Sequence, residues 1–336
     1  MAHTFDETGY LRENPDVAAA VQAGQFTSGQ QHFEMYGRRE SRRFAAEPAP
    51  PSAPQPSGSE HDSSEKNGPG HDGSAPPAER TIHSLIRFER RAPSPQNAVD
   101  IFRDRWASDL GSVLGVSGTG TVPLFAGDDR PRMAAGVFGT EGRLDGLDVL
   151  ELGPLEGGHT YQLEQLGARS VTAVEASVEA YLKCLVVKET LGLQRSRFLL
   201  GDVVEFLAAN RSRFDLVFCS GILYHMADPL ALIREVAKVA DRCFIWTHYY
   251  DRDNHRLMHH PREHALDGFT ATYWSHVYGD KTTAFWGGNR ESAAWMERET
   301  LYAAFRHFGL TEIVELRDDT TFVNGPNVSF TARRPG

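Results

Sequence analysis

The residues best suited to do chemistry in this sequence stand at the ends of three short apolar runs. Glu151 and a glycine-rich turn, 153–158, end the first run, Glu175 ends the second, and Asp202 follows the third. A glycine-rich turn before a helix lets the backbone approach a ligand, and the helix N-terminus offers free amides. A carboxylate ending the next strand can accept hydrogen bonds from a ribose diol, and Asp202 is placed to meet an adenine amine. Together these features predict a site for a nucleoside-containing cofactor.

A fourth apolar run leads into Tyr224 and His225, within the segment GILYHMADP. An imidazole titrates near neutral pH, so His225 could act as a general base or orient an acceptor molecule. The alternative is that His225 packs on the cofactor or caps the helix that begins near Pro229. Tyr224 and His225 are therefore the candidate catalytic residues.

Polar and aromatic residues also follow the fifth run, where His248 and Tyr249 are candidates to face a substrate. Further along, Trp286 could form a substrate wall beside a hinge at Gly287 and Gly288. The histidines of this region are His248, His255, His259, His260 and His264. Because their spacing matches no standard metal site, we interpret them as solvent-facing or substrate-facing and expect no metal.

These residues need a framework, and apolar runs that alternate with helical spacing predict one. The expected strands are Asp148–Leu152, Ser170–Val174, Arg197–Leu200, Asp215–Ser220 and Cys243–Thr247, and the expected helices are Thr160–Leu166, Val178–Leu191, Val203–Ala209 and Leu230–Val239. This alternation is typical of an α/β protein with a Rossmann-like, doubly wound parallel sheet. Thr311–Leu316 and Ser329–Ala332 are expected to add two antiparallel-type strands, which makes seven.

Four motifs now carry a resemblance to a known family. ELGPLEGG, VEAS, LLGD and FDLVFCSGILYHMADP resemble motifs I to IV of class I S-adenosylmethionine-dependent methyltransferases. The last is similar to the subgroup that contains the tRNA wobble-uridine carboxymethyltransferases. The resemblance extends over roughly residues 95–332 and implies S-adenosylmethionine as cofactor. Leu155 departs from the family pattern because it stands where a middle glycine would be.

The resemblance also implies roles for individual residues. Glu151, Gly153 and Gly157 would surround the methionine portion, Glu175 would bind the ribose, and Asp202 with Val203 would bind the adenine. The other expected cofactor-binding residues are Pro154, Ala176 and Ser220. Upstream, residues 96–108 resemble the stretch that lies over the cofactor pocket in the same subgroup. Gln96 and Trp106 are candidates to line that pocket, and ordinary helix packing is the alternative.

Composition divides the chain into four parts. Residues 1–46 contain a short helical pattern that resembles a bacterial module found with varied partner domains, and residues 5–43 are expected to dock a protein partner. Residues 47–80 lack the apolar side chains that a core requires, so they are expected to form a disordered linker. Residues 81–145 form a helical pre-domain. Residues 146–336 form the Rossmann-like domain, with an insertion at about 249–295.

Charge and cysteine content limit the classes of partner. The formal net charge of −10 counts against a large nucleic-acid partner without excluding one. Cys184, Cys219 and Cys243 lie in apolar segments and are expected to be reduced, buried thiols. The sequence shows neither a membrane span nor a signal peptide, so a cytoplasmic location is expected.

The expected function is methyl transfer to an oxygen or nitrogen of a small molecule or glycan-type acceptor. A tRNA wobble-base modifying (carboxy)methyltransferase is a second hypothesis, and a basic stripe beside the pocket would support it. A cofactor-binding regulator or scaffold without turnover is a third, in which the N-terminal module would do the work.

Overall fold

A computed structural model describes residues 5–22, 28–33, 88–253, 259–277, 292–322 and 324–336. The chain divides into two compact units, residues 1–91 and 92–336, which we describe separately. The expected linker at 47–80, Trp286 with the glycine pair 287–288, and His255 lie outside the described residues, as do the side chains of His259 and His260.

The first unit contains three short helices, α1 (Glu7–Glu13), α2 (Pro15–Gln22) and α3 (Gly29–His32). Tyr10 of α1 is fully buried, and its hydroxyl lies 3.0 Å from Nδ1 of His32. The Glu7 carboxylate accepts hydrogen bonds from the backbone N–H groups of Gly29 and Gln30. A buried aromatic ring and a carboxylate on a helix N-terminus therefore hold α1 against α3.

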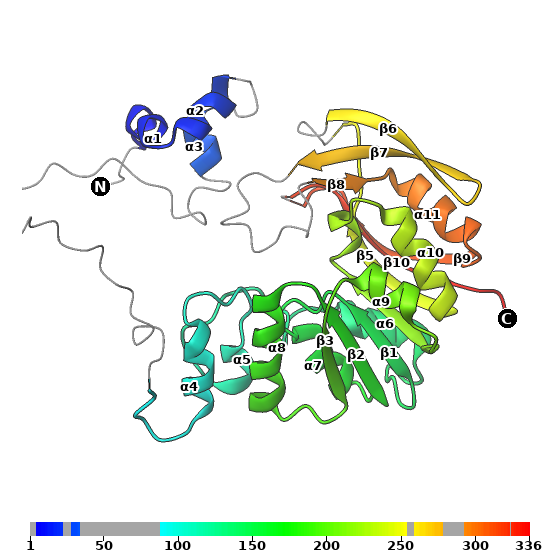
Figure 1. The fold of residues 1–336 in the computed structure, drawn as a ribbon, viewed down its shortest axis with the longest axis horizontal. Helices are drawn as coiled ribbons and strands as arrows, with labels where there is room; N and C mark the ends of the chain where they lie inside the picture. Colours follow the sequence, from blue (N-terminus) through cyan, green and yellow to red (C-terminus); the bar gives the residue numbers. More distant parts are fainter. Residues whose placement is uncertain (1–4, 23–27, 34–87, 254–258, 278–291, 323) are drawn as a thin grey trace, which may run out of the picture. The chain divides into compact units, whose positions relative to one another are not determined.

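The second unit is built on a seven-stranded sheet with the order β3-β2-β1-β4-β5-β10-β9 (Figure 1). The strands are β1 (Asp148–Leu152), β2 (Ser170–Glu175), β3 (Ser196–Leu200), β4 (Leu216–Ser220), β5 (Arg242–His248), β9 (Glu312–Asp319) and β10 (Asn327–Arg333). Strands β1 to β5 are parallel to one another. The sheet confirms the expected doubly wound α/β fold, and the strand order reverses between β1 and β4, where such sheets bind ligands.

The two final strands form antiparallel pairs, as expected. β10 runs antiparallel to both of its neighbours, β5 and β9. β9 pairs only with β10 among the described strands, and it is therefore parallel in direction to β5. The reason is that β10 enters between β5 and β9, so a single reversed strand serves both pairings.

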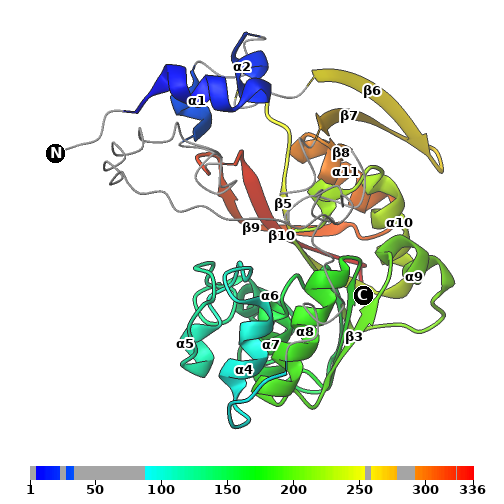
Figure 2. The same cartoon turned by 60° about the vertical axis from the view of Figure 1, so that its left-hand side comes forward.

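Helices cover both faces of the sheet (Figure 2). α6 (Arg130–Phe138), α7 (Gly158–Gln165) and α8 (Val178–Leu191) pack on one face, and α9 (Val203–Ala209), α10 (Pro229–Val239) and α11 (Arg298–His307) pack on the other. Figure 2 shows α7 and α8 on one side of β3 and α9 with α10 on the other.

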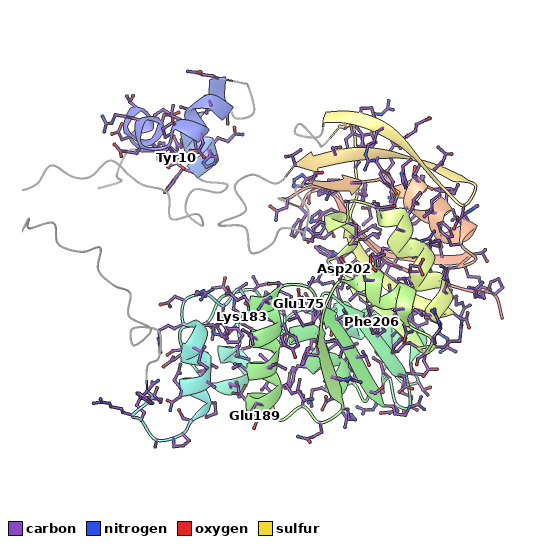
Figure 3. All side chains as sticks on the ribbon, in the orientation of Figure 1. Tyr10, Glu175, Lys183, Glu189, Asp202 and Phe206 are labelled. Carbon is purple, nitrogen blue, oxygen red and sulfur yellow. The ribbon has the colours of Figure 1, made fainter. Side chains whose placement is uncertain are left out.

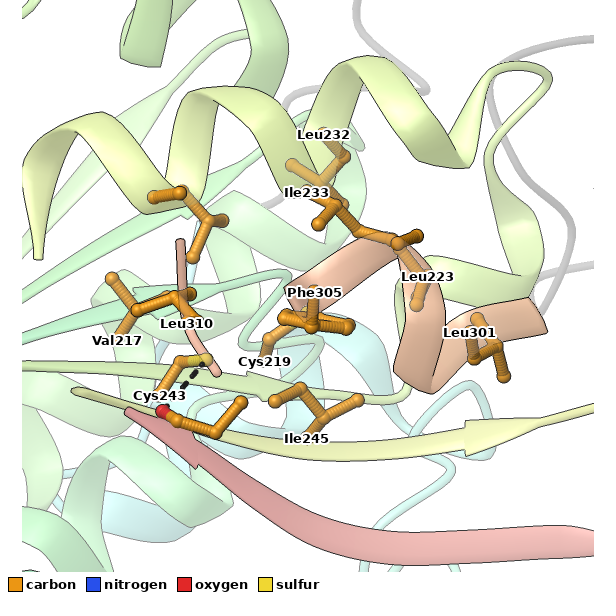
Figure 4. Close-up of a cluster of buried hydrophobic side chains, with 14 of the residues drawn as sticks. Val217, Cys219, Leu223, Leu232, Ile233, Cys243, Ile245, Leu301, Phe305 and Leu310 are labelled. Atoms are coloured by element: carbon orange, nitrogen blue, oxygen red, sulfur yellow. Dashed lines mark hydrogen bonds between the residues drawn. The ribbon is translucent and has the colours of Figure 1, made fainter. Parts of the chain in front are cut away.

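Alternation along the strands explains this division, because successive side chains point to opposite faces. Val217, Cys219 and Ile245 join α10 and α11 in the largest hydrophobic cluster (Figure 4). Phe218 and Phe244 face the other way and stack on one another with ring centroids 5.1 Å apart. All three cysteines are free and buried, as expected from their apolar segments.

The expected insertion contains an antiparallel sheet of its own. Its strands are β6 (His259–Leu266), β7 (Phe269–Val277) and β8 (Ser292–Trp295). Asp267 and Gly268 join β6 to β7 with φ angles of 48° and 83°, as a tight hairpin turn with two left-handed residues requires. An Asp-Gly pair between apolar residues is a hairpin signal that our reading of the sequence did not use.

The segment before β1 is helical in short pieces: α4 (Pro95–Val99), the 3₁₀ helix η3 (Asp100–Phe102), α5 (Gly111–Leu114) and α6. Val99, Phe102 and Trp106 pack with α8 in a separate hydrophobic cluster. Among the described residues, no helix combines the length and the apolar character that crossing a bilayer requires.

Candidate functional site

The glycine-rich turn connects β1 to α7 through a run of left-handed backbone. Gly153, Leu155 and Gly157 have φ angles of 69°, 58° and 79°. Leu155 therefore adopts the conformation that the expected middle glycine would adopt freely, at an estimated cost of about 1–2 kcal/mol. Leu155 departs from the family pattern in its side chain and keeps the backbone path.

Glu175 lies at the end of β2 and faces this turn. One carboxylate oxygen accepts a hydrogen bond from Leu155 N at 3.1 Å, and the other accepts from Ser177 N at 2.7 Å. The side chain is 8% exposed, and burial raises the pKa of its carboxyl above the ordinary value. Figure 3 shows Glu175 and Asp202 at the same edge of the sheet. Glu175 is thus a buried hydrogen-bond acceptor held by two backbone amides.

Glu151 is a second buried acid at this edge, on the neighbouring strand β1. Thr160 of α7 donates its hydroxyl to the Glu151 carboxylate. Burial, and secondarily the charge of Glu175, raises the pKa of Glu151 to about 8. Among the described residues no cationic side chain pairs with either acid. A cationic ligand would therefore be stabilised between them.

The third acid, Asp202, also has a structural role. Asp202 is the N-cap of α9, and its carboxylate accepts from Val204 N at 2.8 Å and Glu205 N at 3.2 Å. Val203 is buried beside it, whereas Ala176 is exposed after β2. Capping stabilises α9 and also fixes the carboxylate at the edge of the sheet.

Glu156 and Lys183 form a buried ion pair behind the turn that our reading of the sequence missed. Both side chains are fully buried, and Lys183 Nζ lies 2.9 Å from Glu156 Oε1. Glu156 also accepts hydrogen bonds from the backbone N–H groups of Ala107 and Ser108. Lys183 donates to the Arg105 carbonyl as well. The pair joins the pre-domain, the glycine-rich turn and α8.

Gln96 and Trp106 lie in this pre-domain, where both make internal contacts. Gln96 Nε2 donates to Asp100 Oδ1 at 2.7 Å, and its Oε1 accepts from Ser117 N at 2.9 Å. Trp106 is 5% exposed and donates its indole N–H to the Val99 carbonyl at 3.0 Å. These contacts favour the packing alternative for both residues.

Tyr224 and His225 follow β4 in the 3₁₀ helix η4 (Leu223–His225). Their ring centroids lie 4.1 Å apart, and the Tyr224 ring also meets the His248 ring edge to face at 4.7 Å. Burial lowers the pKa of His225 to about 3, with further lowering by the charges of His276 and His248. Burial raises the pKa of Tyr224 to about 12. Both rings are therefore neutral at physiological pH.

His248 and Tyr249 are consecutive on an extended chain and point to opposite faces. His248 stacks on Trp295 with ring centroids 5.3 Å apart, on the side of Tyr224. Tyr249 instead donates its hydroxyl to Asp318 of β9 at 2.9 Å. The structure therefore places His248 beside Tyr224, on the face of the sheet that we call the candidate acceptor side. It places Tyr249 in the core on the other face.

Arg130 and Asp128 form a charged pair beside Trp246 that our reading of the sequence missed. The Arg130 guanidinium lies 4.4 Å from the Trp246 ring centroid and pairs with Asp128. Burial would raise the pKa of Asp128, but hydrogen bonds from Arg130 and His159 hold it well below its usual range. Arg130 follows Asp128-Asp129 at the start of α6, and no motif marks this pairing.

The small sheet is anchored to the segment after β4. Trp295 of β8 donates its indole N–H to the Tyr224 carbonyl at 3.0 Å, and Ala294 N donates to the Met226 carbonyl at 2.8 Å. Tyr273 of β7 donates its hydroxyl to Asp228, the N-cap of α10, at 2.7 Å. Strands β7 and β8 thus pack against the segment that carries Tyr224 and His225. Within the described residues, no three His, Cys, Asp or Glu side chains are grouped to hold a metal ion.

Comparison with known proteins agrees with this geometry. Residues 150–242, which contain all three acids and the Tyr224–His225 pair, match a family model described as a methyltransferase domain. The chain contains a class I S-adenosylmethionine-dependent methyltransferase domain. The expected cofactor, S-adenosylmethionine, is the cofactor of this class of domain.

Curated relatives resemble the methyltransferase domain over a limited stretch. The tRNA U34 carboxymethyltransferase of Campylobacter concisus is 28% identical over 113 residues, which is 33% of this chain and 38% of the relative. The protein of the same name from Marinobacter nauticus is 33% identical over 93 residues, 28% of each chain. The match therefore spans less than two fifths of these relatives.

Solved structures resemble a larger part of the chain. The N-terminal domain of EvdMO1 with S-adenosylhomocysteine bound is 25% identical, with a TM-score of 0.55 over 72% of this chain and 95% of that one. The same domain, crystallised in the presence of S-adenosylhomocysteine and D-fucose, gives 24% identity and the same TM-score. These likenesses support the fold of the methyltransferase domain.

We call the region around the glycine-rich turn, Glu151 and Glu175 the donor side. This region fits a cationic nucleoside cofactor. Glu151 and Glu175 are buried acids without cationic partners in the described part of the chain, and Glu175 accepts a hydrogen bond from Leu155 of the glycine-rich turn. Ser220 ends β4, the strand between β1 and β5, so it borders both the donor side and the acceptor side; it is 8% exposed, and its Oγ has no hydrogen-bond partner among the described residues. Buried groups of this kind are destabilising until a ligand pairs with them.

Proposed function

We propose that this protein transfers a methyl group to an oxygen or nitrogen atom of a small molecule or glycan-type acceptor. The observation that carries the proposal is the kind of side chain that encloses the acceptor side. Aromatic and imidazole rings enclose it, namely Tyr224, His225, Trp246, His248 and Trp295. Such rings stack on and hydrogen-bond to an uncharged acceptor at low cost in conformational entropy.

On the donor side, Glu175 would accept hydrogen bonds from the ribose hydroxyls, and Glu151 would face the cationic methionine end. Asp202 would lie beside the adenine while it caps α9. S-adenosylmethionine supplies a sulfonium that donates a methyl group readily, so the protein mainly has to align the two partners and exclude water. Glu175 and Ser220 are both buried, which is consistent with a site from which water is excluded.

On the acceptor side, the low pKa of His225 favours orientation over proton abstraction. An imidazole whose pKa is about 3 is a weak base, although it accepts hydrogen bonds at neutral pH. The neighbouring Tyr224 ring, whose centroid lies 4.1 Å from that of His225, holds the ring in place. His225 would therefore position an acceptor N–H or O–H toward the donor.

A tRNA wobble base is a second candidate acceptor, favoured by the names of the curated relatives. The placement of charge counts against it. Arg213, Lys238 and Arg334 gather near the starts of β4 and β5 and the end of β10, at the opposite edge of the sheet from the site. Two of them pair with Asp241 and the third with Glu235, so they offer little free charge to phosphates.

The experiment is a turnover screen with methyl-labelled S-adenosylmethionine against separate sugar, lipid and RNA fractions of a bacterial extract. We expect label in the sugar or small-molecule fraction. Label in RNA alone would favour the second candidate. Binding of S-adenosylhomocysteine without label in any fraction would support a regulator without turnover.

Glu175→Ala tests the donor side in a separate binding experiment. We expect the affinity for S-adenosylhomocysteine to fall by about 2 kcal/mol, because hydrogen bonds to a charged group contribute about 1.5–3 kcal/mol. Glu189→Ala, an exposed acid at the other end of α8 (Figure 3), is the matched control. Titration calorimetry measures both, and equal affinities would refute the ribose assignment.

A further inference from the structure

Asn327, the first residue of β10, carries a buried amide that is only half used. The residue is 4% exposed, and its Oδ1 accepts a hydrogen bond from the indole N–H of Trp246 at 2.9 Å. Because an indole N–H can only donate, this contact fixes which end of the amide is the oxygen. The Nδ2 group then points away from Trp246, and it has no hydrogen-bond partner among the described residues.

The position of Asn327 places this amide beside the acceptor side. Asn327 is paired with His248 in the register of β10 and β5, so both side chains lie on the same face of the sheet. Ser220 is paired with Trp246 in the register of β4 and β5. Its Oγ also has no partner within the described part of the chain. Two unpaired buried polar groups therefore flank Trp246 at one edge.

Unpaired buried donors are rare in folded proteins because they lose their hydrogen bonds to water and gain nothing in return. Two of them in one place indicate a ligand that pairs with them. The nearby His248 adds a third polar group of fixed orientation. Its Nδ1 lies 3.0 Å and 3.2 Å from the carbonyls of Gly325 and Pro326, so Nδ1 carries a proton.

We propose that Asn327 is a specificity-determining residue that donates its side-chain amide to a hydroxyl oxygen of the acceptor. This inference rests on the proposed function and names the acceptor class within it, a polyhydroxylated compound such as a sugar. A hydroxyl both accepts and donates hydrogen bonds, so it can accept from Asn327 while it donates to an acceptor such as Ser220 Oγ. An amide, a hydroxyl and flat aromatic walls together match the alternating polar and apolar faces of a sugar ring.

The test removes the amide without leaving its partner unpaired. Asn327→Leu deletes the amide donor but leaves the Trp246 N–H without its acceptor. The double variant Trp246→Phe/Asn327→Leu therefore replaces both partners by apolar groups. Such a replacement is often nearly neutral for folding. Trp246→Phe alone separates the effect of the indole from that of the amide. Thr331→Val, buried on the same face of β10 but farther from the edge, is the matched control.

Each variant is assayed with labelled S-adenosylmethionine and a panel of free and nucleotide-linked monosaccharides, together with their deoxy analogues. We expect the Asn327 variants to bind S-adenosylhomocysteine within about twofold of the unsubstituted protein. Their KM for the methylated sugar should rise at least tenfold. They should also stop distinguishing that sugar from the deoxy analogue that lacks the bound hydroxyl, whereas Thr331→Val should behave as the unsubstituted protein.

Two other outcomes overturn the inference in different ways. An unchanged KM and unchanged discrimination in both Asn327 variants would refute the role of Asn327 and leave the proposed function standing. Failure of the unsubstituted protein to methylate any sugar, while it methylates an RNA or an amine of the extract fractions, would refute the polyhydroxylated acceptor itself. For each substituted protein, normal binding of S-adenosylhomocysteine shows that the variant is folded.

Discussion

Replacing Lys183 with methionine should destabilise the methyltransferase domain strongly. The substitution keeps most of the length and the apolar stem of the side chain but removes the charge that faces Glu156 and, at 3.1 Å, Glu179. Both side chains are fully buried and their charged atoms are 2.9 Å apart. At an effective dielectric constant of about 20, two charges at that distance attract by roughly 6 kcal/mol. Breaking a buried pair by removing one partner typically costs about 3–5 kcal/mol, because the remaining charge is left uncompensated.

For a unit of this size, each kcal/mol lowers the midpoint of thermal unfolding by about 2–4 °C. We therefore expect Lys183→Met to lower the midpoint by roughly 6–20 °C, measured by differential scanning calorimetry on the full chain. Lys238→Met is the matched control, because Lys238 pairs with Glu235 but is 58% exposed. Its loss should cost no more than about 1 kcal/mol.

The double variant Lys183→Met/Glu156→Gln separates the ion pair from general packing. A neutral glutamine needs no counter-charge, and its carbonyl can still accept from the N–H groups of Ala107 and Ser108. The double variant should therefore recover a large part of the lost stability. Two results would contradict this reasoning: a cost of Lys183→Met below about 1 kcal/mol, or a further loss of stability when Glu156→Gln is added. In either case the ion pair does not hold the pre-domain, the glycine-rich turn and α8 together.

Two further predictions follow from the shifted pKa values. Glu151 titrates near 4.5 when unfolded and near 8 when folded, so the folded state binds more protons between these values and stability falls as pH rises from about 4.5 to 8. Glu151→Gln should flatten that fall in chemical denaturation followed across pH, and an unchanged slope would contradict the shift. Because the pKa of His225 is about 3, His225→Asn should lower turnover evenly between pH 5 and 8. An inflection near pH 6.5 that disappears in the variant would instead identify His225 as a general base.

Much of the fold could be predicted from the sequence because local signals coincide with it. Helices α8 and α9 begin and end where the apolar spacing predicts, and the side chains of Ser177 and Asp202 cap them. The order of the last two strands could not be predicted, since β10 enters the sheet between β5 and β9, although it follows β9 in the sequence. The small sheet was missed because its pattern is irregular, although the Asp267-Gly268 turn marks it.

The donor side of the candidate site was visible in the sequence because its residues stand at strand ends within recognisable motifs. The acceptor side was only partly visible. His248 was identified from its position after β5, but its neighbour Tyr249 faces the opposite core, a division that follows from strand alternation. Asn327 escaped notice because its contact with Trp246 joins residues 81 positions apart. Contacts of that range leave no local pattern.

The placement of β10 has a consequence for how the chain folds. β5 needs β10 to complete its hydrogen bonds, yet Cys243 and the Ala332 carbonyl that it contacts are 89 residues apart. Closing so long a loop costs entropy before any contact rewards it, so this pairing should form late and slowly. Until then β5 presents an open apolar edge, which is a template for association between partly folded chains. Conditions that slow the arrival of β10 should therefore favour aggregation over refolding.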